Sequence, residues 1–259
     1  MTKLKPKRKE FNPKAKLKQK EKFLRKKVGQ AIRDYDMIRK GDRICVAVSG
    51  GKDSLTLLRM LSSKTIKTSL EYSLIATHIE TDYKCKGCMH GDTLKTVFKD
   101  FGVPGYFGKA DVLKTSKDGK INCFWCSWNK RKAIFEIAEK FNCNKIAFGH
   151  HKDDIIETVL LNLFFNGEIS TMNPKQEMFK GKLTIIRPLC YLEKKEITLF
   201  ATACGLPSQL CSCPFGDFSK RKFVREIIEK AAKGSRVVKT NIFRAPSRIK
   251  EEYLGKVLV

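Results

Sequence analysis

Short apolar runs alternate along the chain with longer segments in which apolar residues recur every three or four positions. The runs have the length and apolar character of buried strands, at residues 44–48, 72–79, 105–107, 143–148 and 185–189. The longer segments have helical spacing, at residues 28–38, 55–61, 92–101, 127–141, 155–165, 192–203 and 219–232. This alternation predicts an α/β fold, with a doubly wound parallel sheet, helices on both faces and cysteine-bearing loops as embellishments.

The distribution of charge divides the chain into three parts. Residues 1–27 hold 13 Lys or Arg, two Glu and almost no apolar pattern, which predicts a flexible basic arm. Residues 28–218 carry the alternating pattern and are expected to form the α/β domain with its cysteine-bearing loops. Residues 219–259 are expected to add a C-terminal helix and a basic tail.

A formal net charge of +26 on 259 residues indicates a polyanionic partner such as nucleic acid. No apolar run approaches the roughly 18 residues of a membrane span, and no signal peptide is visible. We therefore expect a cytoplasmic protein without membrane contact. In that compartment the ten cysteines are expected to stay mostly reduced, as metal ligands or redox groups rather than structural disulfides.

The segment Ser49-Gly50-Gly51-Lys52-Asp53-Ser54 lies between the first strand and its helix. Glycines allow a sharp turn and a close approach to an anion, and the first N–H groups of the helix point outward without partners. Two hydroxyls and the Lys52 ammonium add donors, so this turn is predicted to bind phosphate. It lacks the four-residue spacer of a Walker A loop.

A second junction of the same kind contains Gly149-His150-His151-Lys152-Asp153-Asp154. We expect Asp153 to cap the following helix, which is ordinary helix chemistry. Opposite a phosphate loop, the paired carboxylates are also predicted to hold Mg²⁺, because hard oxygens bridge this ion between protein and phosphate.

Cysteine pairs mark three loops. Cys123 and Cys126 lie at a predicted helix N-terminus, which stabilises thiolates, and a basic face at residues 129–132 follows them. Another CxxC pair, Cys85 and Cys88, lies in a polar loop, and a late pair comprises Cys211 and Cys213. A CxxC pair alone can bind metal, serve redox chemistry or do neither.

The motifs together resemble the TtcA-type tRNA 2-thiocytidine synthetases, a family of PP-loop ATP pyrophosphatases. They are, in order, SGGKDS (49–54), CFWC (123–126), GHHKDD (149–154) with Glu157 and Asn162, IIRPL (185–189) and the late cysteine pair. The resemblance covers roughly residues 23–222. It implies a Rossmann-like PP-loop domain that binds ATP and Mg²⁺, carries a [4Fe-4S] cluster on three cysteines and places sulfur at C2 of cytidine 32 in the tRNA anticodon loop.

By position, the resemblance implies Cys123, Cys126 and Cys213 as cluster ligands, with Cys211 as the alternative to Cys213. The expected nucleotide-binding residues are Ser49, Gly50, Gly51, Lys52, Asp53, Ser54 and Gly149. The expected catalytic residues are Lys52, Asp53, Lys132 and Asp153. A sulfur donor such as a cysteine desulfurase and a homodimeric assembly are further implications of the family.

Two other functions remain open from the sequence. One is the same ATP chemistry with another acceptor, such as 2-thiouridine formation in tRNA; lysidine-type ligation is less compatible with the cysteines because it needs no cluster. The other is a non-catalytic RNA-binding protein in which Cys85, Cys88, Cys123 and Cys126 bind zinc. The second function leaves SGGKDS without a role.

Overall fold

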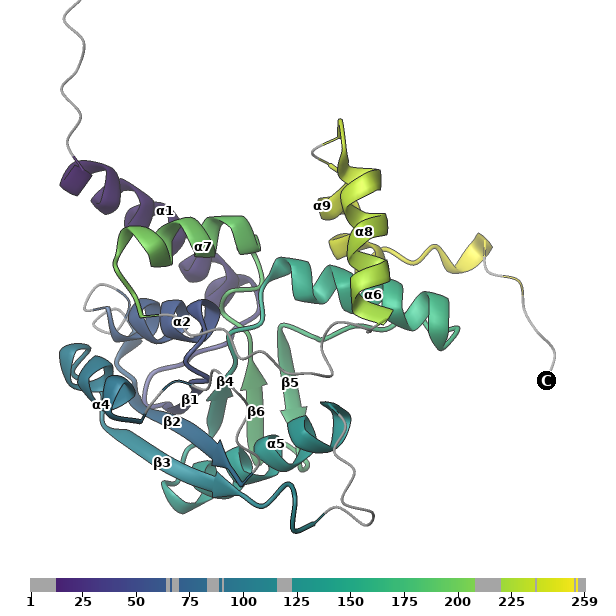
Figure 1. Ribbon diagram of the computed structural model, residues 1–259. Coiled ribbons are helices and arrows are strands. Elements are labelled where there is room, and N and C mark those ends of the chain that lie inside the picture. Colours follow the sequence, from purple (N-terminus) through teal and green to yellow (C-terminus); the bar gives the residue numbers. More distant parts are fainter. Residues whose placement is uncertain are drawn as a thin grey trace, which may run out of the picture.

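The computed structural model describes residues 13–63, 66, 70–82, 89, 91–115, 123–207, 220–235, 237–253 and 255. Within these residues a six-stranded sheet has the order β3-β2-β1-β4-β6-β5 (Figure 1). Its strands are β1 (Arg43–Ala47), β2 (Ser73–Thr81), β3 (Gly105–Ala110), β4 (Lys145–Ala147), β5 (Lys175–Met178) and β6 (Leu183–Ile186).

The first, second, third, fourth and sixth strands are parallel, which confirms the predicted α/β architecture. Chain order reverses direction across the sheet between β1 and β4, so the carboxyl ends of these two neighbours form a topological switch point. The edge strand β5 was not predicted. It pairs antiparallel with β6, from Lys175 opposite Ile186 to Met178 opposite Leu183.

Helices cover both faces of the sheet, as Figure 1 shows for α2 and α7 on one side and α5 on the other. The helices of the α/β layers are α1 (Pro13–Asp34), α2 (Lys52–Ser62), α4 (Gly91–Asp100), α5 (Cys123–Lys140), α6 (Lys152–Phe165) and α7 (Lys194–Ala203). Beyond the sheet, α8 (Lys220–Ala232) and α9 (Val238–Arg244) pack on α6, followed by the short turns η1 (Ala245–Ser247) and η2 (Glu251–Tyr253).

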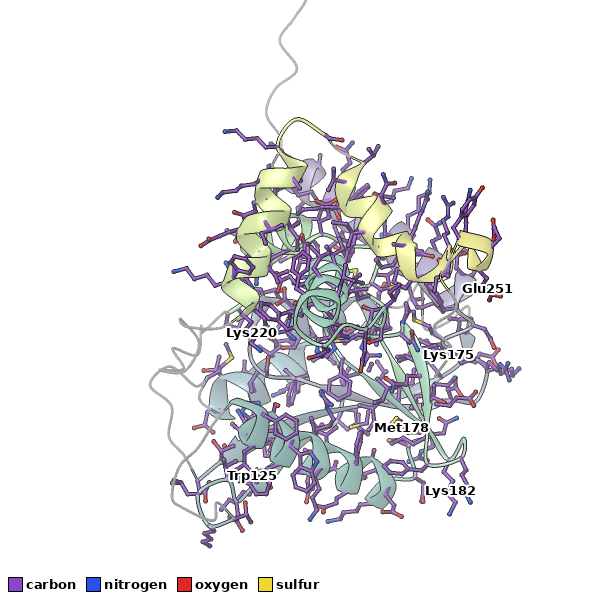
Figure 2. All side chains as sticks on the ribbon, turned by 90° about the vertical axis from the view of Figure 1, so that its right-hand side faces the viewer. Trp125, Lys175, Met178, Lys182, Lys220 and Glu251 are labelled. Carbon is purple, nitrogen blue, oxygen red and sulfur yellow. The ribbon has the colours of Figure 1, made fainter. Side chains whose placement is uncertain are left out.

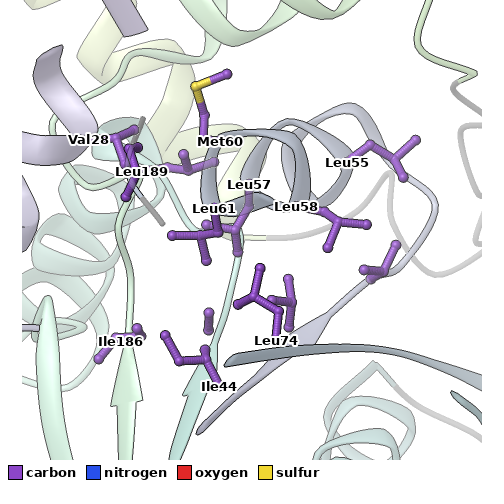
Figure 3. Close-up of a cluster of buried hydrophobic side chains, with 14 of the residues drawn as sticks. Val28, Ile44, Leu55, Leu57, Leu58, Met60, Leu61, Leu74, Ile186 and Leu189 are labelled. Atoms are coloured by element: carbon purple, nitrogen blue, oxygen red, sulfur yellow. The ribbon is translucent and has the colours of Figure 1, made fainter. Parts of the chain in front are cut away.

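The larger apolar core joins α2 to the sheet. Leu57, Leu58 and Leu61 are fully buried on this helix and face Ile44 and Leu74 of the strands (Figure 3). Burying a leucine side chain contributes about 2 kcal/mol, so this cluster fixes the helix that begins at the predicted phosphate turn. A smaller core lies under α5, around Ile134, Ile137 and Ile146.

The N-terminal region differs from its prediction. We expected a flexible arm over residues 1–27, yet α1 begins at Pro13 and continues to Asp34. Leu24 and Val28 are buried in the larger core, 2% and 0% exposed, and Leu17 packs against it. A few apolar side chains at helical spacing therefore dock a highly charged helix; residues 1–12 lie outside the described part.

The C-terminal segment is also more ordered than the sequence suggested. Residues 238–244, placed in a basic tail by the sequence, form α9, and Phe243 packs against the larger core. Val224 and Ile228 attach α8 to α6. Among the described residues, no helix combines the length and apolar character that crossing a membrane requires.

Candidate functional site

The serine hydroxyls of the predicted phosphate turn form hydrogen bonds within the turn. Ser49 N donates to Ser54 Oγ at 3.1 Å, and Ser54 Oγ in turn donates to Gly51 O at 3.0 Å. Gly51 is the N-cap of α2 in an extended conformation, and no side chain caps this helix. The first N–H groups of α2 therefore keep the free, outward-pointing arrangement that suits a phosphate.

Two glycines allow the close packing around this turn. Gly50 has φ +87°, and a Cβ there would lie 2.8 Å from the Cβ of Met89. A Cβ on Gly149 would lie 3.0 Å from the backbone N of Ser54. The second junction thus packs directly against the first, and the two predicted motifs form one site.

The cap of α6 is His151, which corrects the prediction that Asp153 caps this helix. Asp154 N donates to His151 Nδ1 at 3.4 Å, and His151 N donates to Asp154 Oδ2 at 3.0 Å, completing a capping box. Because Nδ1 accepts, the proton of a neutral His151 ring is on Nε2. That nitrogen is buried without a hydrogen-bond partner and lies 3.9 Å from Asp53 Oδ1.

Asp153 is positioned by a different set of donors. Its Oδ1 accepts from Lys239 Nζ at 2.6 Å and its Oδ2 accepts from Lys194 N at 2.7 Å. Burial opposes ionisation, but these two hydrogen bonds outweigh it and lower the pKa of Asp153. A metal ion at Asp153 would have to displace Lys239, a partner from α9 that the sequence did not indicate.

Asp53 remains more open than Asp153. Its side chain is 34% exposed, and burial raises its pKa although His151 opposes the shift. Among the described residues, no group of three His, Cys, Asp or Glu side chains is arranged to hold a metal ion by itself. The sequence predicted Mg²⁺ at the adjacent carboxylates of Asp153 and Asp154, but Asp154 accepts from His151 N in the capping box. Asp53 is therefore the more open candidate to share an ion with Asp153 and a bound phosphate.

The first CxxC turn lies at the same edge of the sheet. Because α5 connects the parallel strands β3 and β4, its N-terminus faces their carboxyl ends. Trp125 Nε1 donates to Val112 O at 3.3 Å, just beyond β3, and Cys126 is half-buried. Figure 2 shows Trp125 in this first turn, toward the same side of the view as Lys220 at the start of α8.

The cysteine positions fit an iron–sulfur cluster as far as they are described. Residues three apart in the first turn of a helix share one face, so the backbone of α5 brings Cys123 and Cys126 together. The side chain of Cys123 and the whole of Cys85, Cys88, Cys211 and Cys213 lie outside the described residues. The choice between Cys211 and Cys213 stays a prediction.

The basic face of α5 divides into two parts. The Lys132 ammonium is 3.9 Å from Glu136 and 5.9 Å from the Trp128 ring centre, on the exposed side of the helix. Lys130 instead acts on His78, and Arg131 acts on His150, in each case lowering the histidine pKa together with burial. Lys130 is half-buried, whereas Arg131 and Lys132 are both exposed.

His78 supports the strand that leads into the phosphate turn. Its Nδ1 lies 2.7 Å from Val48 O, and since a carbonyl only accepts, Nδ1 carries the proton. Burial lowers the pKa of His78, which favours this neutral form. The Val48 carbonyl just before Ser49 is thereby fixed.

Other residues from the predicted motifs have structural partners. Glu157 is 4% exposed and forms a two-point ion pair with Arg225 of α8, at 2.9 and 3.2 Å. Asn162 donates to Ser170 O at 3.1 Å and to Ser170 Oγ at 2.8 Å. These contacts tie α6 to α8 and to the loop before β5, and place neither side chain in the phosphate turn.

Comparison with known proteins agrees with this geometry. A family model described as a PP-loop domain matches residues 20–229. The chain is 35% identical over 240 residues to a tRNA-cytidine(32) 2-sulfurtransferase of Geobacter sulfurreducens, covering 90% of this chain and 92% of that protein. It is 37% identical over 195 residues to a protein of the same name from Syntrophotalea carbinolica, covering 74% of each chain.

A solved structure shares the fold. The U34-tRNA thiolase NcsA from Methanococcus maripaludis, determined with its [4Fe-4S] cluster, superposes with a TM-score of 0.74 and 22% identity, over 92% of this chain and 82% of that one. With the sequence relatives at about 35% identity over most of their length, the match settles the family. The chain belongs to the PP-loop proteins and, among them, to the TtcA family of tRNA-cytidine(32) 2-sulfurtransferases.

Proposed function

We propose that this protein is an ATP-dependent tRNA sulfurtransferase that adenylates the C2 oxygen of cytidine 32 and replaces it with sulfur. The observation that carries the proposal is that three segments lie at the same, carboxyl edge of the sheet. These are the uncapped N-terminus of α2, the Gly149 junction packed against it, and the CxxC turn of α5. A nucleotide and a sulfur-handling group would thus act on the same base.

The proposed first step is attack of the C2 oxygen of cytosine on the α-phosphorus of ATP, with pyrophosphate as leaving group. The backbone N–H groups of residues 50–54 and the Lys52 ammonium would stabilise the charge that grows on the departing phosphates. Asp53 and Asp153 would hold Mg²⁺ between protein and phosphates. His151 Nε2–H has no hydrogen-bond acceptor among the described residues and lies 3.9 Å from Asp53 Oδ1.

In the proposed second step a hydrosulfide-level sulfur attacks C2, the C2–O bond breaks and AMP leaves with the oxygen. Cytidine, ATP and hydrosulfide thereby give 2-thiocytidine, AMP and pyrophosphate without net oxidation. A [4Fe-4S] cluster on Cys123, Cys126 and a late cysteine, predicted as Cys213, would supply a binding position for this sulfur. The positive end of the α5 dipole would favour the thiolate form of the cysteines.

The proposed substrate, a tRNA anticodon loop, suits a strongly basic protein. An anticodon-loop base is already unpaired, so it can enter a pocket without the cost of opening a duplex. The lysines of α1 and the basic residues of α8 and α9 would hold the RNA backbone. A cysteine desulfurase as sulfur donor, a homodimer and a cytoplasmic location remain part of the proposal.

Nucleoside analysis tests the reaction directly. The full-length protein, purified without oxygen, is incubated with tRNA, ATP, Mg²⁺ and sulfide, and the digested RNA is analysed by mass spectrometry. We expect 2-thiocytidine, AMP and pyrophosphate in equal amounts. A 2-thiouridine product would favour the related uridine enzymes, and a colourless zinc protein without any product would favour the RNA-binding alternative.

The cysteine assignment has its own prediction. Cys126→Ala should remove the brown colour and lower thiolation at least about 100-fold, with the ATP dissociation constant within about twofold of wild type. Cys204→Ala, which alters a half-buried thiol at the end of α7, is the matched control and should keep both properties. A Cys126→Ala protein that retains its iron and sulfide would remove this residue from the ligand set.

A further inference from the structure

Arg187 is a buried cation at the carboxyl end of β6. It follows Ile186, which pairs with Ala147 of β4, and its side chain belongs to a residue only 5% exposed. Nη1 donates to Asn173 O, while Nε is buried and has no hydrogen-bond partner. Arginine is rarely buried in this way without a partner for its charge.

The charges around Arg187 make this burial more costly. Among the described residues, no carboxylate lies within ion-pair distance of its guanidinium. Burial and the neighbouring Arg131 of α5 lower the pKa of Arg187 to about 10, so it stays charged at neutral pH. Arg131 itself is exposed, and the nearest acid of the cluster, Asp154, acts on His150 rather than on Arg187. A buried guanidinium without an ion-pair partner, next to a second cation, indicates a place where an anion completes the structure.

His150 extends the same cluster. Its Nδ1 is buried without a partner, and its ring lies 5.6 Å from that of Phe148. Burial, Arg187 and Arg131 lower the pKa of His150 to about 4, which keeps the ring neutral at physiological pH. An unpaired ring nitrogen therefore adjoins two cations.

The cluster lies at the same, carboxyl edge of the sheet as the proposed active site. Alternation along β6 places Ile186 with the core under α2 and Arg187 on the α5 side of the sheet. Arg131 is about one and a half turns of α5 beyond Cys126, and His150 directly follows Gly149, which packs on the phosphate turn. The chain therefore links the cluster to the CxxC turn through α5 and to the phosphate turn through Gly149.

We propose that Arg187, Arg131 and His150 form a separate subsite for one phosphate group of a substrate. This inference rests on the proposed function, in which both ATP and tRNA bring phosphate groups to this edge. A guanidinium fork matches the oxygens of a phosphate, and a neutral imidazole adds a hydrogen bond without further charge. The alternative is a purely structural arginine that holds the Asn173 carbonyl.

Two binding measurements on the full-length protein separate the sources of the phosphate. Arg187→Gln removes the charge, and Arg43→Gln removes the same charge from the opposite, amino end of the sheet as the matched control. ATP affinity is measured by calorimetry, and tRNA affinity by filter binding at several salt concentrations. The subsite predicts an approximately tenfold weaker affinity for one of the two ligands with Arg187→Gln, and less than twofold change with Arg43→Gln.

The pattern identifies the ligand. A weaker ATP affinity with unchanged tRNA binding assigns the subsite to the nucleotide. A weaker tRNA affinity, with a salt slope reduced by about one, assigns it to an RNA phosphodiester. Arg187→Lys, which keeps the charge but not the fork, should fall between wild type and Arg187→Gln in the same assay.

Thermal unfolding of the ligand-free protein tests the alternative in which Arg187 only holds the Asn173 carbonyl. Removing an uncompensated buried cation should leave the melting temperature unchanged or raise it, whereas losing a purely structural contact should lower it. Unchanged affinity for both ligands in Arg187→Gln and in Arg131→Gln, which alters the exposed arginine of the cluster, would overturn the proposal. The ATP and tRNA affinities are measured without any thiolated product. If Arg187→Gln lowers one of these affinities but the wild-type protein forms no 2-thiocytidine, the subsite is retained and the proposed reaction is rejected.

Discussion

The two strand-to-helix junctions of the site are built on opposite plans. At the first, Gly51 precedes α2 with no side-chain cap, and the serine hydroxyls bond within the turn. At the second, His151 and Asp154 satisfy the end of α6 in a capping box. The free N–H groups of α2 are thus available to a phosphate, whereas α6 contributes side chains: an imidazole, two carboxylates and their lysine partner. In the proposed function, anion binding thus belongs to the first junction, and the positioning of protons and Mg²⁺ belongs to the second.

The largest expected effect comes from giving α2 the kind of cap that α6 has. Gly51 has φ −77°, and a Cβ there would be 3.4 Å from Ser49 Oγ, so a side chain fits. Gly51→Asp should weaken ATP binding by at least about 100-fold, because its carboxylate occupies the N–H groups and repels phosphate. Calorimetry measures the affinity.

The same variant should not lose stability. An acidic N-cap stabilises a helix by about 1 kcal/mol, so urea unfolding should show an equal or higher free energy of unfolding. Gly51→Ala is the matched control and should bind ATP within a fewfold of wild type. Tight ATP binding by Gly51→Asp would show that the free α2 N-terminus is not the phosphate site.

His150 of the second junction should make the free energy of unfolding depend on pH. His150 has a pKa of about 4 in the folded protein, against about 6.5 for an unfolded histidine. Between pH 4 and 6.5 the unfolded histidine binds a proton that the folded one does not. The free energy of unfolding is therefore highest above pH 6.5 and falls as the pH drops toward 4. The full loss from this residue is about 3 kcal/mol.

Urea unfolding at pH 4 to 7 measures this loss. His150→Gln should flatten the profile, while His78→Gln should remove only the contribution of His78, whose pKa is also lowered. Parallel profiles for wild type and His150→Gln would contradict the burial of a neutral His150 ring.

The smallest expected effect concerns Lys239, whose ammonium donates a hydrogen bond to the Asp153 carboxylate. Lys239→Met frees Asp153 Oδ1, so the Mg²⁺ concentration for half-maximal AMP formation should fall about two- to fivefold. Lys233→Met, an exposed charge loss after α8, is the control. An equal Mg²⁺ dependence in both variants would show that Asp153 does not hold the ion during the reaction.

The sequence predicted those features that depend on local pattern. The apolar runs located β1, β2 and β4, and the motifs SGGKDS and GHHKDD located both junctions because strand, loop and helix follow one another in the chain. The sequence did not indicate β5, whose residues Lys175–Met178 are mostly polar and are ordered by pairing with β6. The run of lysines in α1 concealed the few apolar positions that dock it.

The remaining features of the site depend on contacts between distant segments. Asp153 follows the usual rule for a helix cap, but Lys239, 86 residues later, and Lys194 N engage its carboxylate instead. Arg187 was visible only as part of IIRPL, and its importance comes from burial without an acid, which no spacing encodes. Lys132 is exposed and lies near Glu136 of the same helix, which its place in a basic run did not indicate.

The contact between Gly149 and Ser54 also limits which residue can stand at position 149. No room for a Cβ separates the two backbones, so even an alanine there would push the second junction away from the first. The spacing of the two junctions therefore depends on a residue that carries no functional group of its own.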